Sequence, residues 1–289
     1  MRSRLFVPGS RPELFLKALN AGADAVCFDL QDAVAPEKKN SAREAVAEFL
    51  RTLPNLRSKP KIMVRVNPTT SEHFGRDLVA VVGPGIDLIN LPMVETGQDV
   101  RTTCVLLDQL ERQKKATSRL RLLVNIEVPR AVRLAAEIAG ADTRVMGLQV
   151  GFGDLFEPFG IKRTSAAAIN MVRMSVRLAA AEARLPTFDA AFTAVSQPEK
   201  FREEAISARE LGLSGKTCIH PSQVAIANEV FSVSTDEIER ARRIVQAGDK
   251  AIREGVGAVL LDGVMIDAPF IEGARMLLDQ AGHRSSNVD

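Results

Sequence analysis

The sequence predicts an α/β protein, a TIM (β/α)8 barrel with a C-terminal helical and hairpin extension. Eight short apolar runs alternate with segments of helical periodicity, and the runs are apolar almost without interruption. The length of 289 residues exceeds the roughly 200 to 250 residues that one barrel needs. We therefore expect a barrel domain at residues 1–231 and an extension at residues 232–289. A doubly wound open sheet is the alternative fold for the same alternation.

The eight predicted strands are residues 4–8, 24–30, 61–66, 87–92, 121–127, 145–151, 186–192 and 216–220. The helices between them have boundaries marked by capping residues, prolines and glycines. These signals are the Ser41–Glu44 capping box, Pro129, the Ser196–Glu199 segment around Pro198, Gly22 and Gly212. Apolar strands joined by crossover helices imply a parallel sheet whose outer face is covered by those helices.

The residues after the eighth strand predict elements beyond the barrel. A helix is expected near 221–231, and a second helix begins at a Ser234–Glu237 capping box. Asp262 and Gly263 lie between two short apolar runs, which predicts a hairpin, and a last helix follows it. We expect this extension to pack on the barrel mouth or on a neighbouring subunit.

Composition and charge exclude several classes of function. The 38 basic and 36 acidic residues give a net charge of +2 without a basic stripe, so nucleic-acid binding is not expected. No apolar run approaches the roughly 18 residues of a membrane span and the N-terminus lacks a signal-peptide pattern, so we expect a cytoplasmic protein without membrane attachment. Cys27, Cys104 and Cys218 are widely spaced, which favours buried thiols over a disulfide or metal ligands.

Polar residues gather where the predicted strands end, which in a barrel of this type is the active-site face. They are Asp29, Gln31, Asp32, Arg65, Asn67, Glu95, Asn125, Glu127, Asp154 and His220, together with Gly151 and Gly153. Any one of the carboxylates could instead cap the following helix, and His220 could be only a helix-entry residue. The two glycines lack the third glycine of a dinucleotide fingerprint, so an NAD site is not expected.

Carboxylates that converge on one face repel one another unless a cation lies between them. Oxygen ligands without histidine suit Mg²⁺, which binds one or two protein carboxylates and keeps water and substrate oxygens as its other ligands. Glu127 and Asp154 end neighbouring strands, so we predict that they hold Mg²⁺. Arg65 would then bind a substrate carboxylate through two parallel hydrogen bonds. Asp29 and Asp32 are expected to order water and side chains around the metal.

The chain also resembles a known family over nearly its whole length. The segments that carry the likeness are, in order, "RSRLFVPGSRPELFLKAL", "GADAVCFDLQDAVAPEKKNSAREAV", "VRVNP", "LPMVET", "VNIEVPRAV", "VGFGDL", "IHPSQVAIANEVF" and "DGVMIDAPFIEGARMLL". Together they resemble the citrate lyase β-subunit-like proteins of the HpcH/HpaI aldolase superfamily, relatives of the malyl-CoA and citramalyl-CoA lyases. The resemblance implies a TIM barrel, Mg²⁺ as cofactor, and cleavage of a 3-hydroxyacyl-CoA thioester of the citramalyl, malyl or citryl type. The products would be a keto acid and acetyl-CoA or an acetate-type product.

The resemblance also implies roles for individual residues. It puts the metal on Glu127 and Asp154 and the substrate carboxylate on Arg65. In malyl-CoA-lyase-like relatives the Asp of the "G-x-M-I-D" segment, here Asp267, is the acid/base offered across a subunit interface, so a homo-oligomer, a trimer or hexamer, is expected. Asp32 joins Arg65 and Asp267 in the expected catalytic set. The residues expected near the CoA thioester are Phe6, Pro8, Arg11 and Gly153.

Three positions depart from the family pattern. The family usually reads "DLEDAV", "LPKVE" and "IET", whereas this chain has Gln31, Met93 and Val128. Loss of the ammonium group at position 93 would lower the rate by about 10² to 10³. Two alternatives therefore stay open: an acyl-CoA thioesterase on the same scaffold, and a catalytically weakened scaffold that binds a CoA thioester. A role in a citrate lyase complex with an acyl carrier protein is a further alternative.

Overall fold

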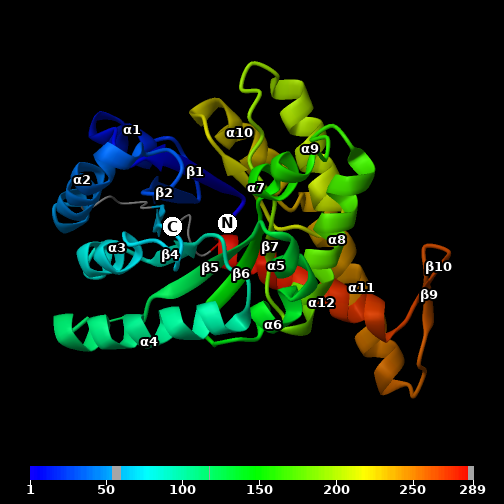
Figure 1. Ribbon diagram of the computed structural model, residues 1–289. Helices are drawn as coiled ribbons and strands as arrows, with labels where there is room; N and C mark the ends of the chain where they lie inside the picture. The colour runs from blue at the N-terminus through cyan, green and yellow to red at the C-terminus, as the bar shows by residue number, and fades with distance from the viewer. Residues whose placement is uncertain (54–59, 117, 286–289) are drawn as a thin grey trace. The chain divides into compact units, whose positions relative to one another are not determined.

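The computed structural model describes residues 1–53, 60–116 and 118–285. The chain divides into two compact units, Met1–Phe231 and Ser232–Asp289. The first unit holds eight strands and their covering helices, and the second holds two long helices and a hairpin (Figure 1). None of the helices in these described segments combines the length and apolarity that crossing a lipid bilayer requires.

Eight parallel strands form one sheet in the first unit. They are β1 Ser3–Pro8, β2 Ala25–Asp29, β3 Lys61–Arg65, β4 Leu88–Leu91, β5 Arg121–Ile126, β6 Val145–Val150, β7 Thr187–Phe188 and β8 Lys216–Cys218. Their order in the sheet is β7-β6-β5-β4-β3-β2-β1-β8, and a parallel bridge between Asp189 and Lys216 joins the two ends of this order. The sheet therefore closes into the predicted TIM barrel, and the open doubly wound alternative is wrong.

Helices cover the outer face of the barrel (Figure 1). They are α1 Phe15–Leu19, α2 Lys39–Arg51, α3 Phe74–Val81, α4 Gly97–Lys114, α5 Pro129–Arg133, α6 Ala135–Ala139, α7 Phe152–Phe156, α8 Ala166–Glu182, α9 Pro198–Glu210 and α10 Pro221–Val230. In β2, Val26 and Phe28 belong to the large core that includes residues of the helices, whereas Cys27 packs with Met63 and Phe188 in a separate cluster inside the barrel. Because both faces of each strand are buried, the strands are mainly apolar, and a few polar side chains lie inside the barrel.

Several local signals mark boundaries as predicted. Pro129 is the first residue of α5. Gly22 and Gly212 follow α1 and α9 with left-handed φ values of 75° and 80°, which favour glycine over residues with a Cβ. The cysteines Cys27, Cys104 and Cys218 are free and buried, as the sequence predicts.

One predicted helix start is wrong, and a second, at Pro198, differs only in its capping residue. A 3-10 turn at Pro36–Lys38 runs directly into α2, so that helix begins at Lys39 and the predicted Ser41–Glu44 capping box lies inside it. The residue before α9 is Gln197 and not Ser196, and it provides no side-chain cap. In both places the helical backbone begins at a proline, Pro36 or Pro198, and not at a residue whose side chain caps the helix.

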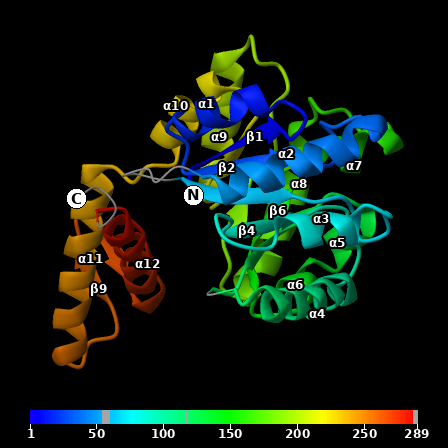
Figure 2. The ribbon, with the colours of Figure 1, turned by 90° about the vertical axis from the view of Figure 1, so that its left-hand side faces the viewer.

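The second unit consists of α11 Thr235–Arg253, β9 Val259–Leu261, β10 Val264–Ile266 and α12 Ala268–Ser285. The predicted Ser234–Glu237 capping box opens α11, and α11 lies beside α12 (Figure 2). The predicted hairpin is present, and Asp262 and Gly263 have the positive φ values, 51° and 78°, of a two-residue type I′ turn. A Cβ at Gly248 would lie only 2.3 Å from Ile271 Cδ1, so a glycine there allows the two helices to approach closely.

Candidate active site

A pocket of about 500 Å³ opens at the carboxyl ends of the barrel strands. In α/β barrels this face carries the catalytic groups. The polar and charged residues that line the pocket are Asp29, Asp32, Arg65, Asn125, Glu127, Gln149, Asp154, Glu157, Arg163, Thr193 and Thr217. Phe6, Pro8 and Gly153 also line it. Of the first-unit residues predicted for catalysis, substrate binding or metal binding, all except Arg11 line this one pocket. Four other residues of the predicted active-site face do not line it, namely Gln31, Asn67, Glu95 and His220.

Arg65 and Asp29 form a buried ion pair on one wall. Arg65 Nε and Nη2 donate to the two carboxylate oxygens of Asp29 at 2.7 and 2.6 Å, and Nη1 lies 3.1 Å from Asp32 Oδ2. Burial alone would raise the pKa of Asp29, but Arg65 and the backbone N–H groups of Gln31 and Ala33 outweigh it and lower the pKa below its usual range. Asp29 therefore holds the guanidinium in place, and the remaining N–H groups of Nη1 and Nη2 can bind a ligand.

Glu127 is a deeply buried carboxylate of the pocket and is only 2% exposed. Its Oε1 accepts the backbone N–H of Met93 at 2.7 Å, and its Oε2 accepts Asn125 Nδ2 at 3.1 Å. Burial raises the pKa of Glu127 to about 7, opposed by Arg65 and the Met93 N–H and reinforced by Asp154 and Asp32. In the described part of the chain no lysine or arginine forms an ion pair with this carboxylate.

Gly151, at the end of β6, leaves the space that Glu127 occupies. A Cβ at Gly151 would lie 2.4 Å from Glu127 Oε2, closer than any real contact. Since the φ of Gly151 is −123°, the requirement for glycine is one of space and not of backbone conformation.

Asp154 and Asp32 complete an acidic group around Glu127. Asp154 lies in the first turn of α7 and makes no side-chain hydrogen bond or ion pair within the described residues. Burial raises the pKa of Asp32, Arg65 opposes this effect, and Asp154 and Asp29 add to it. The three carboxylates therefore lie near enough to repel one another.

The donor set fits a hard divalent cation. No group of three or more His, Cys, Asp or Glu side chains is arranged to hold a metal within the described ranges. Mg²⁺ does not require such a group, because one or two carboxylates, water and substrate oxygens commonly complete its coordination. Glu127 and Asp154 offer two carboxylates without cationic partners in the described chain, and a positive charge between them would relieve the repulsion.

Four other residues predicted from the sequence are Phe6, Arg11, Asp267 and His220, and of those in the first unit only Phe6 lines the pocket. The ring of Phe6 lies 5.3 Å from the Arg65 guanidinium carbon and so forms part of the same wall. Arg11 is exposed, pairs with Glu13 and does not line the pocket. Asp267 precedes α12 in the second unit, and its Oδ1 is buried without a hydrogen-bond partner among the described residues. His220 is the N-cap of α10, where Nδ1 accepts the Ser222 N–H at 3.2 Å, so its role is helix entry.

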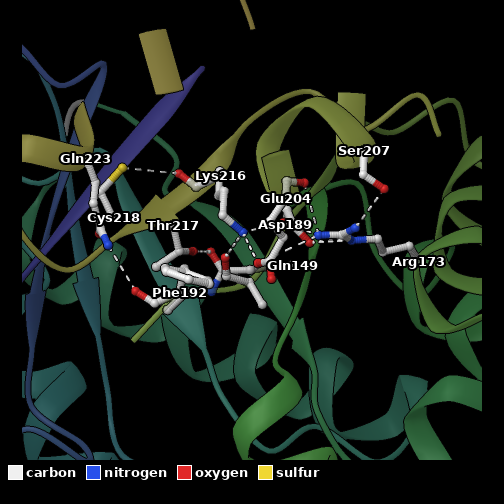
Figure 3. A network of polar contacts seen from close by, with 12 residues as sticks. Gln149, Arg173, Asp189, Phe192, Glu204, Ser207, Lys216, Thr217, Cys218 and Gln223 are labelled. Atoms are coloured by element: carbon white, nitrogen blue, oxygen red, sulfur yellow. Dashed lines mark hydrogen bonds and ion pairs between the residues drawn. The ribbon is translucent and has the colours of Figure 1, made fainter. Parts of the chain in front are cut away.

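Sequence reasoning missed the charged wall at β7 and β8 (Figure 3). Asp189 is fully buried and pairs with Arg173 and Lys216, while Glu204 accepts from Lys216 at 2.6 Å and from Arg163 at 2.8 Å. Burial would raise the pKa of Asp189, but Lys216 and Arg173 lower it to about 2. The available signal was the pair of charged residues inside the apolar strand runs "PTFDAAF" and "KTCIH". This wall places Arg163 at the pocket.

Known proteins resemble this chain over nearly its whole length. The family described as HpcH/HpaI aldolase/citrate lyase matches residues 2–221. The citrate lyase subunit beta of Haemophilus influenzae is 34% identical over 282 residues, which cover 97% of this chain and 96% of that relative. The L-malyl-CoA/beta-methylmalyl-CoA lyase of Rhodobacter capsulatus is 32% identical over 302 residues, with 97% and 94% covered.

A solved structure shows the same architecture. Protein CitE from Mycobacterium tuberculosis, in complex with magnesium, acetoacetate and coenzyme A, has a TM-score of 0.75 at 30% sequence identity. The match covers 98% of this chain and 100% of that chain.

Proposed function

Since the chain belongs to the HpcH/HpaI aldolase/citrate lyase family, a family of carbon–carbon lyases, we propose that it is itself a Mg²⁺-dependent lyase of 3-hydroxyacyl-CoA thioesters. Substrates of the citramalyl, malyl or citryl type would give a keto acid and acetyl-CoA or an acetate-type product. The observation that carries this proposal is the pair of carboxylates, Glu127 and Asp154, which line one pocket without a cationic partner in the described chain. The solved relative that contains magnesium and coenzyme A supports it.

Each of the charged pocket residues has a separate role in the proposed bond cleavage. Bound Mg²⁺, held by Glu127 and Asp154, would supply Lewis-acid stabilisation of charge on substrate oxygens. Arg65, fixed by Asp29, binds the substrate carboxylate and so orients the bond to be broken. Asp32 takes the proton of the substrate hydroxyl, and its raised pKa makes it a stronger base than an ordinary aspartate.

Asp267 is the proposed acid that protonates the departing thioester enolate. Its buried Oδ1 has no hydrogen-bond partner among the described residues, as expected of a carboxyl group that serves a ligand. The unit that carries it exposes large apolar side chains, since Leu260, Met265 and Phe270 are 74%, 58% and 49% exposed. Burial of such a surface by a second copy supports a homo-oligomer, a trimer or hexamer, in which Asp267 is offered across the subunit interface.

The CoA thioester occupies the same mouth of the barrel. Phe6, Pro8 and Gly153 line the pocket and contact the thioester end, and the exposed Arg11, in the loop after β1, contacts the CoA moiety. The three free buried cysteines suit a reducing compartment, which supports a cytoplasmic location.

Incubation with citramalyl-CoA, malyl-CoA and citryl-CoA tests this proposal. We expect release of the matching keto acid, dependence on Mg²⁺, and loss of activity in Asp154→Asn. If no member of the panel releases a keto acid in the presence of Mg²⁺, the proposal is wrong. Free CoA without a keto acid would instead identify a thioesterase.

Gln31 and Met93 favour a second candidate, a weakened scaffold that binds a CoA thioester. Gln31 is 7% exposed and its buried Oε1 has no partner among the described residues, so the amide is poorly suited to its place. Met93 supplies only its backbone N–H to Glu127. The double variant Gln31→Glu/Met93→Lys discriminates, because lyase activity that appears only in this variant would favour the scaffold.

A further inference from the structure

Polar side chains inside the barrel form a chain of hydrogen bonds that ends at Glu127. Arg4 Nε on β1 donates to Gln149 Oε1 at 3.1 Å. Gln149 Nε2 donates to Asn125 Oδ1 at 3.1 Å, and Asn125 Nδ2 donates to Glu127 Oε2 at 3.1 Å. We name Gln149 and Asn125 the amide relay. Barrel interiors are usually filled by branched apolar side chains, so this polar line is unusual.

The donor and acceptor chemistry fixes the direction of the relay. A guanidinium has only donors, so Gln149 must present its oxygen to Arg4 and turn its amide nitrogen to Asn125. Asn125 must then present its oxygen to Gln149 and its nitrogen to Glu127. A donor-only group at one end of the relay therefore guarantees a donor at the carboxylate at the other end.

Neighbouring side chains reinforce this direction. Arg4 Nη2 donates to Thr217 Oγ1 at 3.2 Å. The Thr217 hydroxyl then donates to Gln149 Oε1 at 3.3 Å (Figure 3). A hydroxyl can donate or accept, so Thr217 follows the direction that Arg4 sets. Asn90 Nδ2 donates to Asn125 Oδ1 at 2.7 Å, which also keeps that oxygen turned away from Glu127.

Arg4 occupies a costly position for a purely structural residue. It is 0% exposed, its Nη1 has no hydrogen-bond partner, and no carboxylate in the described chain forms an ion pair with it. Its guanidinium carbon lies 4.3 Å from the centroid of the Phe188 ring, and Nη2 donates to the Asp189 carbonyl oxygen at 3.1 Å. A buried charge without a counter-ion destabilises a fold relative to an apolar side chain of similar size.

We propose that Arg4 is a positioning residue for the metal site, acting through the amide relay on Glu127. Without Arg4, Gln149 can turn over and present Oε1 to Asn125 Oδ1, whose orientation Asn90 keeps. Repulsion between these two acceptor oxygens would displace Asn125, so that its Nδ2 no longer holds Glu127 Oε2 in place. The inference deepens the proposed function and rests on it, because it takes Glu127 as a Mg²⁺ ligand.

The test is the Mg²⁺ dissociation constant of the metal-free full chain, measured by isothermal titration calorimetry without substrate. We expect Arg4→Met to weaken Mg²⁺ binding by about 10- to 100-fold, the usual effect of removing a group that orients a metal ligand. Its melting temperature in EDTA should stay the same or rise, because an unpaired buried charge is removed. Arg4→Lys keeps a donor-only group and should bind Mg²⁺ within about threefold of the wild type.

Two further variants separate the relay from general stability. Phe188→Leu removes the ring beside Arg4 and should lower the melting temperature without changing the Mg²⁺ dissociation constant. Gln149→Leu removes the middle of the relay and should weaken binding as Arg4→Met does. Unchanged binding in both Arg4→Met and Gln149→Leu, or equal weakening in Phe188→Leu, would overturn the inference. Absence of Mg²⁺ binding in the wild type would instead show that the proposed function itself is wrong.

Discussion

The free energy of unfolding of the metal-free protein should fall as the pH rises towards neutrality, because the buried carboxyl group of Glu127 ionises. Burial raises the pKa of Glu127 from its usual 4.5 to about 7 in the folded chain. The folded state therefore holds a proton that the unfolded state releases. This proton stabilises the folded state fully below pH 4.5, and the contribution is lost as the pH rises through about 7.

The size of the effect follows from the shift. One pKa unit corresponds to about 1.4 kcal/mol, so the rise from 4.5 to about 7 corresponds to on the order of 3 kcal/mol. Glu127 is almost completely buried, so solvent screening reduces this value little. Mg²⁺ should restore the lost stability near neutral pH, since it binds the ionised carboxylate of the folded state only.

Urea unfolding in EDTA between about pH 5 and about pH 8 measures this effect, with Glu127→Gln as the matched control. Other groups also titrate in this range, so the informative quantity is the difference between the wild type and the variant. We expect the free energy of unfolding of the wild type to fall relative to that of Glu127→Gln as the pH rises. Identical pH dependence of the two proteins would refute the reasoning.

Two other predictions concern the same pocket. Asp29→Asn leaves Arg65 without its buried ionic partner. It should lower the free energy of unfolding in urea by about 3 to 5 kcal/mol and raise the KM for substrate. An unchanged unfolding midpoint would contradict the role of this ion pair. Gly151→Ala would place a Cβ 2.4 Å from Glu127 Oε2 and should weaken Mg²⁺ binding in calorimetry. The control Gly153→Ala adds a Cβ with no neighbouring atom within 4 Å and should leave the Mg²⁺ affinity unchanged. Equal Mg²⁺ affinities of the two variants would contradict the claim that Gly151 is required for space.

The barrel could be predicted because each strand and each helix leaves its own pattern in a short stretch of the sequence. Each strand is buried on both faces, so each is a mainly apolar run, and the runs alternate with helices that have clear ends. The helix start at Lys39 was harder to predict, because a preceding 3-10 turn carries the helical backbone past the pattern at Ser41.

The candidate site could be predicted only in part. Glu127 and Asp154 follow strands and Arg65 is the last residue of one, and strand ends in a barrel meet at one face. The partner of Arg65 depends on which carboxylate the fold brings within 3 Å, and the sequence alone does not contain that distance. The wall around Asp189 was missed for the same reason, since its partners come from α8 and β8.

The central claim is that Glu127 and Asp154 together hold Mg²⁺ in the pocket. Calorimetric titration of Mg²⁺ into the metal-free wild type and the variants Glu127→Gln and Asp154→Asn tests it most directly. The account predicts one bound ion per chain in the wild type and affinity weakened by at least about tenfold in each variant. Unchanged Mg²⁺ affinity in either variant would contradict it.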